Sequence, residues 1–102
     1  MKLNVADFHV FIKTIDGRSF NTLHRGAAFK VHVVPAGLYY TPASSGKSRI
    51  QEWKYIERVA LRFVETGSFH PSDYHDITMN ASYVLTLIGY FLKRTITKIE
   101  EC

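Results

Sequence analysis

Residues 29–41 read FKVHVVPAGLYYT, and this segment predicts a β-hairpin. Its first half alternates apolar and polar side chains, so Val31 and Val33 would share one buried face of a strand. Pro-Ala-Gly at positions 35–37 is turn chemistry, because proline presets one backbone dihedral and glycine permits a positive φ. Residues 38–41 then return as the second strand.

The sequence after the hairpin changes from loop to helix. Residues 42–48 read PASSGKS, a composition typical of a loop, and residues 49–66 are expected to form a helix. We expect Ser48 to cap the N-terminus of this helix and Gly67 to end it. Its inward face would carry apolar side chains at a 3-4-3 spacing, namely Trp53, Ile56, Ala60 and Phe63.

Residues 7–16, which precede the hairpin, fit either a helix or a strand. A helix capped by Asp7 and ended by Gly17 would gather four apolar residues on one face. These are Phe8, Phe11, Ile12 and Ile15. The competing strand would align Phe8, Val10 and Ile12. We favour the helix, because in the strand Phe11 and Ile15 would point to water.

The last apolar segment predicts a helix that begins near Thr78 or Asn80 and runs to about Arg94. It is apolar nearly all round, so it would lie in the centre of the core or in a subunit interface. Residues 68–76 form the loop before it. Together these elements predict an α+β fold in a single domain, residues 1–102. In this fold the hairpin, with room for a third strand, packs against two or three helices.

Length and composition agree with one soluble domain. The chain has 102 residues, of which 46% are hydrophobic, and this is enough apolar surface for a core. Cys102 is the one cysteine, so the chain has neither an internal disulfide nor a CxxC metal site. Its start is not a signal peptide, and its most apolar stretch, residues 81–92, is shorter than the ~20 residues of a membrane-spanning helix. We therefore expect a cytoplasmic protein with no membrane partner.

The net charge of +4 is concentrated in the middle of the chain. Residues 17–64 contain eight Lys and Arg against two Glu, whereas residues 65–80 contain three acidic residues and no Lys or Arg. Lys54, Arg58 and Arg62 follow one another at i, i+4 and i+8, which places them in line on one helix face. We call these three residues the basic row.

The segment before the basic row adds groups that bind phosphate. Lys47 and Arg49 are basic, and Ser45 lies among backbone amides that could hold a phosphate group. Tyr39 and Tyr40 could offer a stacking surface to bases. The candidate nucleic-acid-binding residues are therefore Tyr39, Tyr40, Ser45, Lys47, Arg49, Lys54, Arg58 and Arg62.

Three partial motifs for catalysis or metal binding are incomplete. Residues 46–48, Gly-Lys-Ser, match the end of a P-loop, but Thr41 stands where its first glycine belongs. Residues 52–54, Glu-Trp-Lys, match a fragment of metal-dependent nucleases, but we expect them on a helix and without a second carboxylate. Residues 70–76 hold two His and two Asp on a single segment, without a supporting group. We expect no catalytic residue, no cofactor and no bound metal.

These features predict a non-enzymatic nucleic-acid-binding protein that contacts phosphates through a basic loop and a helix face. The alternative is a protein-interaction or adaptor module that forms a homodimer through the apolar last helix. In that case the basic row is only a solvated helix face, with Glu57 and Glu65 each three residues from a basic neighbour. One exposed surface that joins the five basic residues to Tyr39 or Tyr40 would favour nucleic-acid binding, whereas basic residues that are dispersed, or paired with Glu57 and Glu65, would favour the interaction module.

Overall fold

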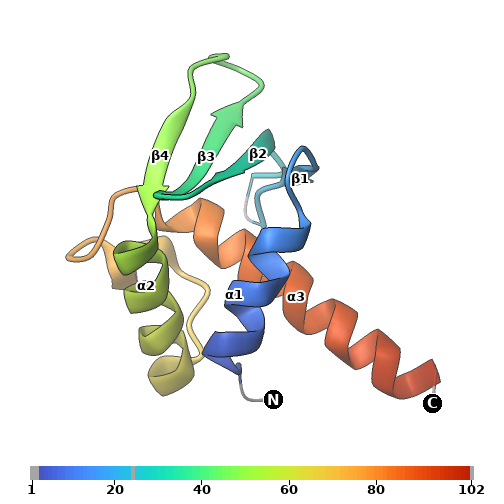
Figure 1. The fold of residues 1–102 in the computed structure, drawn as a ribbon. Helices are drawn as coiled ribbons and strands as arrows, with labels where there is room; N and C mark the ends of the chain where they lie inside the picture. The colour runs from blue at the N-terminus through green and yellow to red at the C-terminus, as the bar shows by residue number, and fades with distance from the viewer. Residues whose placement is uncertain (1–2, 24, 102) are drawn as a thin grey trace.

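The computed structural model describes residues 3–23 and 25–101, with side chains as far as Lys93 (Figure 1). The elements, in chain order, are α1 (Val5–Thr14), β1 (Ser19–Asn21), β2 (Ala28–Val34), β3 (Gly37–Pro42), β4 (Arg49–Glu52), α2 (Trp53–Thr66), the 3₁₀ helix η1 (Pro71–Tyr74) and α3 (Ala81–Glu101). The α+β class predicted from the sequence is confirmed, with a larger sheet than the expected hairpin.

Four strands form one antiparallel sheet in the order β1-β2-β3-β4. The predicted hairpin is confirmed as β2 and β3, in which Val31 pairs with Tyr40 and Val34 pairs with Gly37. The close approach of β4 requires a glycine at position 37, because a Cβ atom there would lie 2.2 Å from the carbonyl oxygen of Gln51. The sheet gains one strand on each side of the hairpin, whereas the sequence predicted one extra strand at most.

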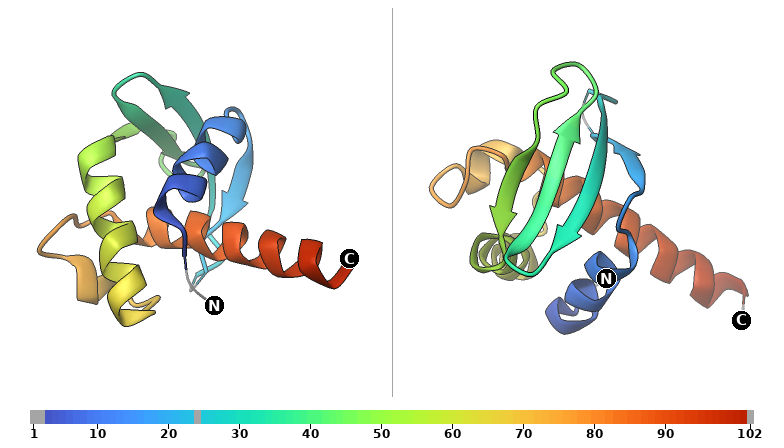
Figure 2. Two further views of the ribbon diagram at one scale, coloured as in Figure 1. Left: turned by 60° about the horizontal axis from the view of Figure 1, so that its bottom comes forward. Right: turned by 45° about the horizontal axis from the view of Figure 1, so that its top comes forward.

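The helices cover one face of the sheet and leave the other uncovered (Figure 2). Burial alternates along β2 accordingly, since Phe29 and Val31 are buried whereas Lys30 and His32 are exposed. The covered face packs on α3, where the ring of Phe29 meets that of Tyr83 edge-on at 4.9 Å. We call the uncovered side the open face. Its exposed residues include Ser19, Lys30, His32, Tyr39 and Ile50, which are cross-strand neighbours.

The N-terminal segment forms the favoured helix rather than a strand. In α1 the side chains of Phe8, Phe11 and Ile12 are buried. The cap is Asn4 and not Asp7 as predicted, because the Asn4 Oδ1 atom accepts a hydrogen bond from the Asp7 backbone N–H at 3.0 Å. Asp7 instead lies in the first turn, where a negative charge is favourable beside the positive end of the helix dipole.

The helix predicted from residue 49 begins at Trp53 instead, and Ser48 does not cap it. Residues 49–52 form β4, whose backbone pairs with β3. Glu52 occupies the N-cap position without a side-chain hydrogen bond to the helix. The C-terminal end is as predicted, since Gly67 has φ 66° and its N–H donates to the Phe63 carbonyl at 2.8 Å.

Trp53 joins α2 to the hairpin turn. The sequence placed it on the inward face of the helix, but it is half-buried at the junction with β4. Its indole N–H donates to the carbonyl oxygen of Pro35 at 2.9 Å, and its backbone N–H donates to that of Ala36 at 3.2 Å. The indole ring also lies 4.3 Å from the imidazole of His9, measured between ring centres. The buried face of α2 consists of Ile56, Val59, Ala60 and Phe63.

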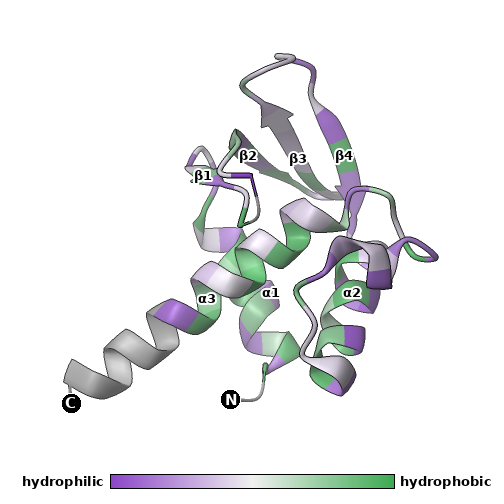
Figure 3. Cartoon of the chain, turned by 180° about the vertical axis from the view of Figure 1, so that it is seen from behind, coloured by the Kyte–Doolittle hydropathy of each residue, from purple (hydrophilic) through white to green (hydrophobic). Residues whose placement is uncertain are grey.

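The last helix is central in the core, as one of the two sequence interpretations expected. It continues past the predicted end near Arg94, and its final turns extend beyond the other elements (Figure 2). Seen from behind, its hydrophobic residues gather where it crosses α1 (Figure 3). There Phe91 packs against Phe8 and Phe11, with ring centres 5.8 and 5.2 Å apart. Its fully buried apolar residues are Ala81, Val84, Leu85, Leu87 and Ile88.

Two further predictions concern the membrane and the thiol. No helix within residues 3–23 and 25–101 is long and apolar enough to span a membrane. Cys102, the basis of the cysteine argument, lies outside the described residues.

Candidate nucleic-acid interface

The five basic residues predicted to bind phosphate lie at two separate places. Lys47 is in the turn between β3 and β4, and Arg49 is the first residue of β4. The basic row lies on α2, which leaves the opposite end of β4 (Figure 1). The β3–β4 turn and α2 therefore do not form one continuous basic surface, and this dispersion counts against the interface predicted from the sequence.

Arg62 is engaged within the chain. Both terminal nitrogens of its guanidinium donate to the carboxylate of Asp76, with Nη2 2.8 Å from Oδ2, and Nη1 also donates to the carbonyl oxygen of Asp73 at 3.0 Å. The hydrogen bonds from Arg62 lower the pKa of the Asp76 carboxyl, and the same contact raises the pKa of Arg62. This bidentate pair holds the loop before α3 against α2, so Arg62 is not available to a phosphate.

Lys54 and Arg58 remain exposed on α2. The Nζ atom of Lys54 lies 5.0 Å from the centre of the Tyr55 ring, a cation–π contact on its own helix. Two basic residues of the row are therefore open to solvent, on a helix that also carries Glu57 and Glu65.

Tyr39 and Tyr40 point to opposite faces of the sheet. Tyr40 is buried, and its ring stacks on that of Tyr83 with centres 4.2 Å apart. Burial raises the pKa of Tyr40 to about 12, and within the described residues its hydroxyl has no hydrogen-bond partner. The prediction that Tyr40 offers a stacking surface is therefore wrong. Tyr39 lies on the open face, with 36% of its surface exposed.

Tyr39 has polar and apolar neighbours on the open face. It lies opposite His32 on β2 and opposite Ile50 on β4. A shallow depression of about 440 Å³ beside it is also lined by Lys30 and Ser48. Neither Lys30 nor His32 was among the candidate residues predicted from the sequence. Their cross-strand register with Tyr39 was the missing information.

His32 has a partner at the edge of this face. Its Nδ1 atom lies 2.9 Å from Oδ1 of Asp16, which also accepts the backbone N–H of Val33 at 2.8 Å. Both side chains of the pair are exposed, so its contribution to stability is small. The pair orients His32 beside the sheet.

The turn between β3 and β4 contains the remaining predicted residue, Ser45. Ser45 is exposed, and its Oγ accepts the backbone N–H of Lys47 at 3.3 Å. The hydroxyl groups of Thr41 and Ser48, at the base of the turn, lie 2.7 Å apart. These bonds keep the turn compact, so that the side chain of Lys47 is presented at one end of the sheet.

The sheet and its loops contain one acidic residue, Glu52, at the end of β4. From Gly17 to Gln51 there is neither Asp nor Glu, and we call this segment the basic sheet lobe. Its basic residues are Arg18, Arg25, Lys30, Lys47 and Arg49. All four strands lie in this segment except for Glu52, the last residue of β4. The charge asymmetry of the chain is thus an asymmetry between the sheet and the helices.

The carboxylates considered for metal binding have structural partners. Asp73 accepts a hydrogen bond from the Ser68 hydroxyl at 2.5 Å, and Asp76 is paired with Arg62. In the described part of the chain, no three His, Cys, Asp or Glu side chains come together as a metal ion requires. Glu52 and Lys54, the nuclease-like pair, lie at the junction of β4 and α2.

Comparison with known proteins identified no relative. The chain matches no protein-family model, and no curated protein or solved structure is significantly similar to it.

Proposed function

We propose that this protein binds single-stranded nucleic acid, without catalysing a reaction, through the open face of the basic sheet lobe. The observation that carries the proposal is the combination of an acid-free, basic segment with an exposed tyrosine on an uncovered sheet. Open sheet faces with aromatic residues suit single strands, because every base has a ring face that can stack on an aromatic side chain.

Each part of the open face has a role in this proposal. Tyr39 stacks on a base, with Ile50 beside it as an apolar contact. Lys30 on β2 pairs with Thr41 on β3, so the Lys30 ammonium group and the Thr41 hydroxyl can bind the same phosphate. Lys47, in the turn between β3 and β4, extends the path of positive charge along the backbone of the ligand. None of these contacts reads base edges, so we expect little sequence preference.

The test separates the basic sheet lobe from the basic row. A short single-stranded oligonucleotide is titrated by calorimetry at several salt concentrations, with Lys30→Gln, Lys47→Gln and Arg58→Gln as matched single-charge variants. Each phosphate contact on a single strand contributes about −0.7 to the log–log salt slope. Arg49 lies opposite Tyr40 and so on the covered face of the sheet. We therefore expect a slope of about −1.4 from Lys30 and Lys47, which falls by about 0.7 in each lobe variant and stays unchanged in Arg58→Gln.

Two outcomes count against the proposal. If no binding is detected at low salt, the nucleic-acid hypothesis ends. If Arg58→Gln reduces the slope as much as Lys30→Gln does, the exposed charges of α2 bind phosphate and the open face is not the specific surface.

The alternative, a homodimeric interaction module, has less support than the sequence suggested. The homodimer was predicted because α3 was expected to have apolar surface that the core of one chain does not cover. Val84 and Leu87 are buried within a single chain, and Phe91 packs on α1. On α3, Tyr90 is the large side chain with notable exposure in the described residues, at 38%.

A further inference from the structure

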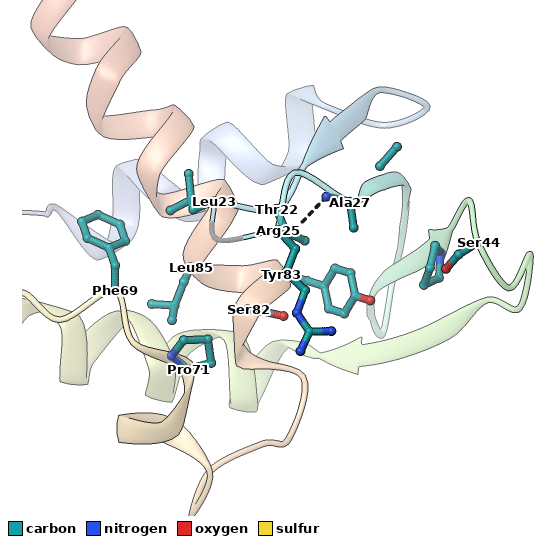
Figure 4. A pocket seen from close by; sticks show the side chains of 12 residues that line it. Thr22, Leu23, Arg25, Ala27, Ser44, Phe69, Pro71, Ser82, Tyr83 and Leu85 are labelled. Carbon is teal, nitrogen blue, oxygen red and sulfur yellow. Dashed lines mark hydrogen bonds between the residues drawn. The ribbon is translucent and has the colours of Figure 1, made fainter.

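A cavity of about 400 Å³ lies on the helix-covered side of the sheet, away from Tyr39 (Figure 4). It is enclosed by the loop between β1 and β2, the start of the β3–β4 turn, the loop before η1 and the first turn of α3. Cavities of a few hundred cubic ångströms at the meeting of several segments are the usual size and setting of small-ligand sites.

Rings held by the core line one part of the cavity. Tyr83 is half-buried, stacked on Tyr40 at 4.2 Å and held edge-on by Phe29. Phe69, on the opposite wall, lies 4.9 Å from the ring of Phe63. Because these contacts fix both ring planes, a planar ligand would find its apolar walls already formed.

The loop that carries Arg25 is tied to α3. The backbone N–H of Leu23 donates to the Oγ1 atom of Thr86 at 3.3 Å. Within the loop, the Thr22 hydroxyl oxygen accepts the N–H of Ala27 at 3.0 Å, and the Thr22 N–H donates to the Ala27 carbonyl at 3.0 Å. These bonds hold Arg25 at the mouth of the cavity, where its side chain extends toward Ser82 (Figure 4).

The polar lining of the cavity suits an anion. Arg25 is exposed, and in the described part of the chain it forms no ion pair. Ser44 and Ser82 add hydroxyl donors, and the described lining contains no Asp or Glu. The first turn of α3, to which Ser82 belongs, also lacks an acidic residue, so the positive end of the helix dipole is not offset.

From this lining we infer that the cavity binds a small organic phosphate with a planar ring, of the nucleoside monophosphate class. The guanidinium of Arg25 and the hydroxyl of Ser82 hold the phosphate, because arginine matches phosphate with paired N–H donors. The ring lies between the walls formed by Tyr83 and Phe69. This site does not depend on nucleic-acid binding at the open face, which lies on the other side of the sheet.

The test uses adenosine 5′-monophosphate as the probe, with adenosine and inorganic phosphate as separate arms. Binding is followed by calorimetry and by backbone amide shifts in the isotope-labelled full chain. We expect the nucleotide to bind more tightly than either fragment and to shift the amides of residues 22–28 and 82–85. Arg25→Gln should weaken binding roughly tenfold or more, since it removes a charged hydrogen-bond donor pair.

Arg58→Gln is the matched control, because it removes the same charge from an exposed arginine of α2 that does not line the cavity. It should leave the affinity unchanged, and Arg25→Lys should retain part of it. The inference is overturned if no cavity amide shifts at millimolar nucleotide, or if Arg58→Gln weakens binding as much as Arg25→Gln. It is equally overturned if inorganic phosphate binds as tightly as the nucleotide, since the ring walls would then contribute nothing.

Discussion

Tyr39 and Tyr40 are neighbours in the sequence with opposite environments. Successive side chains of a strand point to opposite faces of the sheet, so one of the two tyrosines must face the core. The sequence alone did not say which one. Pairing with β2 decides it, because Tyr40 lies opposite the buried Val31 and Tyr39 opposite the exposed His32. Of the two tyrosines predicted to bind bases, one is therefore exposed and the other is buried.

Replacement of Tyr39 should affect binding and not folding. We expect Tyr39→Ala to weaken binding of a single-stranded oligonucleotide by about 1–3 kcal/mol, the usual loss when a stacking aromatic is removed. Tyr39→Phe keeps the ring and should bind nearly as well as the natural chain. Calorimetric titration of both variants at one salt concentration makes the comparison. Equal affinity of Tyr39→Ala and the natural chain would remove Tyr39 from the interface.

Replacement of Tyr40 by Phe should affect the pH dependence of folding. The folded state holds the pKa of Tyr40 at about 12, above the ~10 of an unfolded tyrosine, so the folded state retains the proton longer. The stabilisation is complete below pH ~10 and is lost as the pH rises through ~12. Urea unfolding followed by circular dichroism should therefore show a smaller loss of stability over this range in Tyr40→Phe. At neutral pH the variant should be as stable or more so, because the buried hydroxyl has no partner among the described residues.

A side chain at Gly37 should destabilise the sheet. The Cβ atom of Gly37→Ala would meet the carbonyl oxygen of Gln51 at 2.2 Å, so the backbone of β3 or β4 must shift. We expect a loss of about 2 kcal/mol or more in the free energy of unfolding. Gly46→Ala is the control, since its φ of 68° is also positive but no atom lies within 4 Å of the added Cβ. A loss in Gly37→Ala no larger than that of the control would contradict the close approach.

At the scale of elements, the strands that the sequence analysis missed are those whose side chains break the usual pattern. In β4 the apolar Ile50 faces water and the polar Gln51 is buried, where its Oε1 accepts the Thr78 hydroxyl at 3.1 Å. Because the apolar residue is exposed and the polar one is buried, β4 lacks the alternating apolar pattern from which a strand is predicted. It also runs directly into α2, so its residues were included in the predicted helix. β1 has only three residues, too few for periodicity. The long elements with clear apolar faces, α1, β2, β3, α2 and α3, were predictable.

The candidate site was less predictable than the fold. The position of Lys47 in an exposed turn followed from composition. The pairing of Arg62 with Asp76, which removes Arg62 from the phosphate-binding candidates, could not be predicted. Asp76 lies 14 residues away, in a loop whose path the sequence does not specify. The open face also depends on which side of the sheet the helices cover, and that is a tertiary property.

The pair between Arg62 and Asp76 should protect the loop before α3. We expect Asp76→Asn to speed backbone hydrogen exchange across residues 68–77, with little change elsewhere. The Asp76 pKa is lowered in the folded chain, so this protection is present above the usual aspartate pKa and is lost as the pH falls through the folded value. Arg62→Gln should open the same loop, and it should leave the salt slope for oligonucleotide binding unchanged. A reduced slope would return Arg62 to the phosphate-binding residues.

For the molecule as a whole, charge and apolar surface are divided between two layers. Residues 17–51, which form nearly all of the sheet, hold five Lys and Arg and no acidic residue, whereas the helices hold most of the core. A ligand with many negative charges would therefore approach the sheet side first.

The burial of α3 predicts a monomer. Sedimentation equilibrium at high micromolar concentration should give the mass of one 11.7 kDa chain, because Val84, Leu87 and Ile88, among the described side chains of α3, are buried within it. A stable dimer that Tyr90→Glu dissociates would instead restore the interaction module as the leading function.

Because no loop separates β4 from α2, a change in β4 can be followed by the fluorescence of Trp53, the first residue of α2. Glu52 ends β4 and occupies the N-cap position of α2, so movement of β4 on ligand binding must turn the first residue of α2 with it. That residue is Trp53, the one tryptophan of the protein. Its indole N–H donates a hydrogen bond to the Pro35 carbonyl oxygen, and its ring lies against that of His9. Occupation of the open face should therefore change the intensity or wavelength of tryptophan fluorescence, without any label, at a distance from the ligand itself.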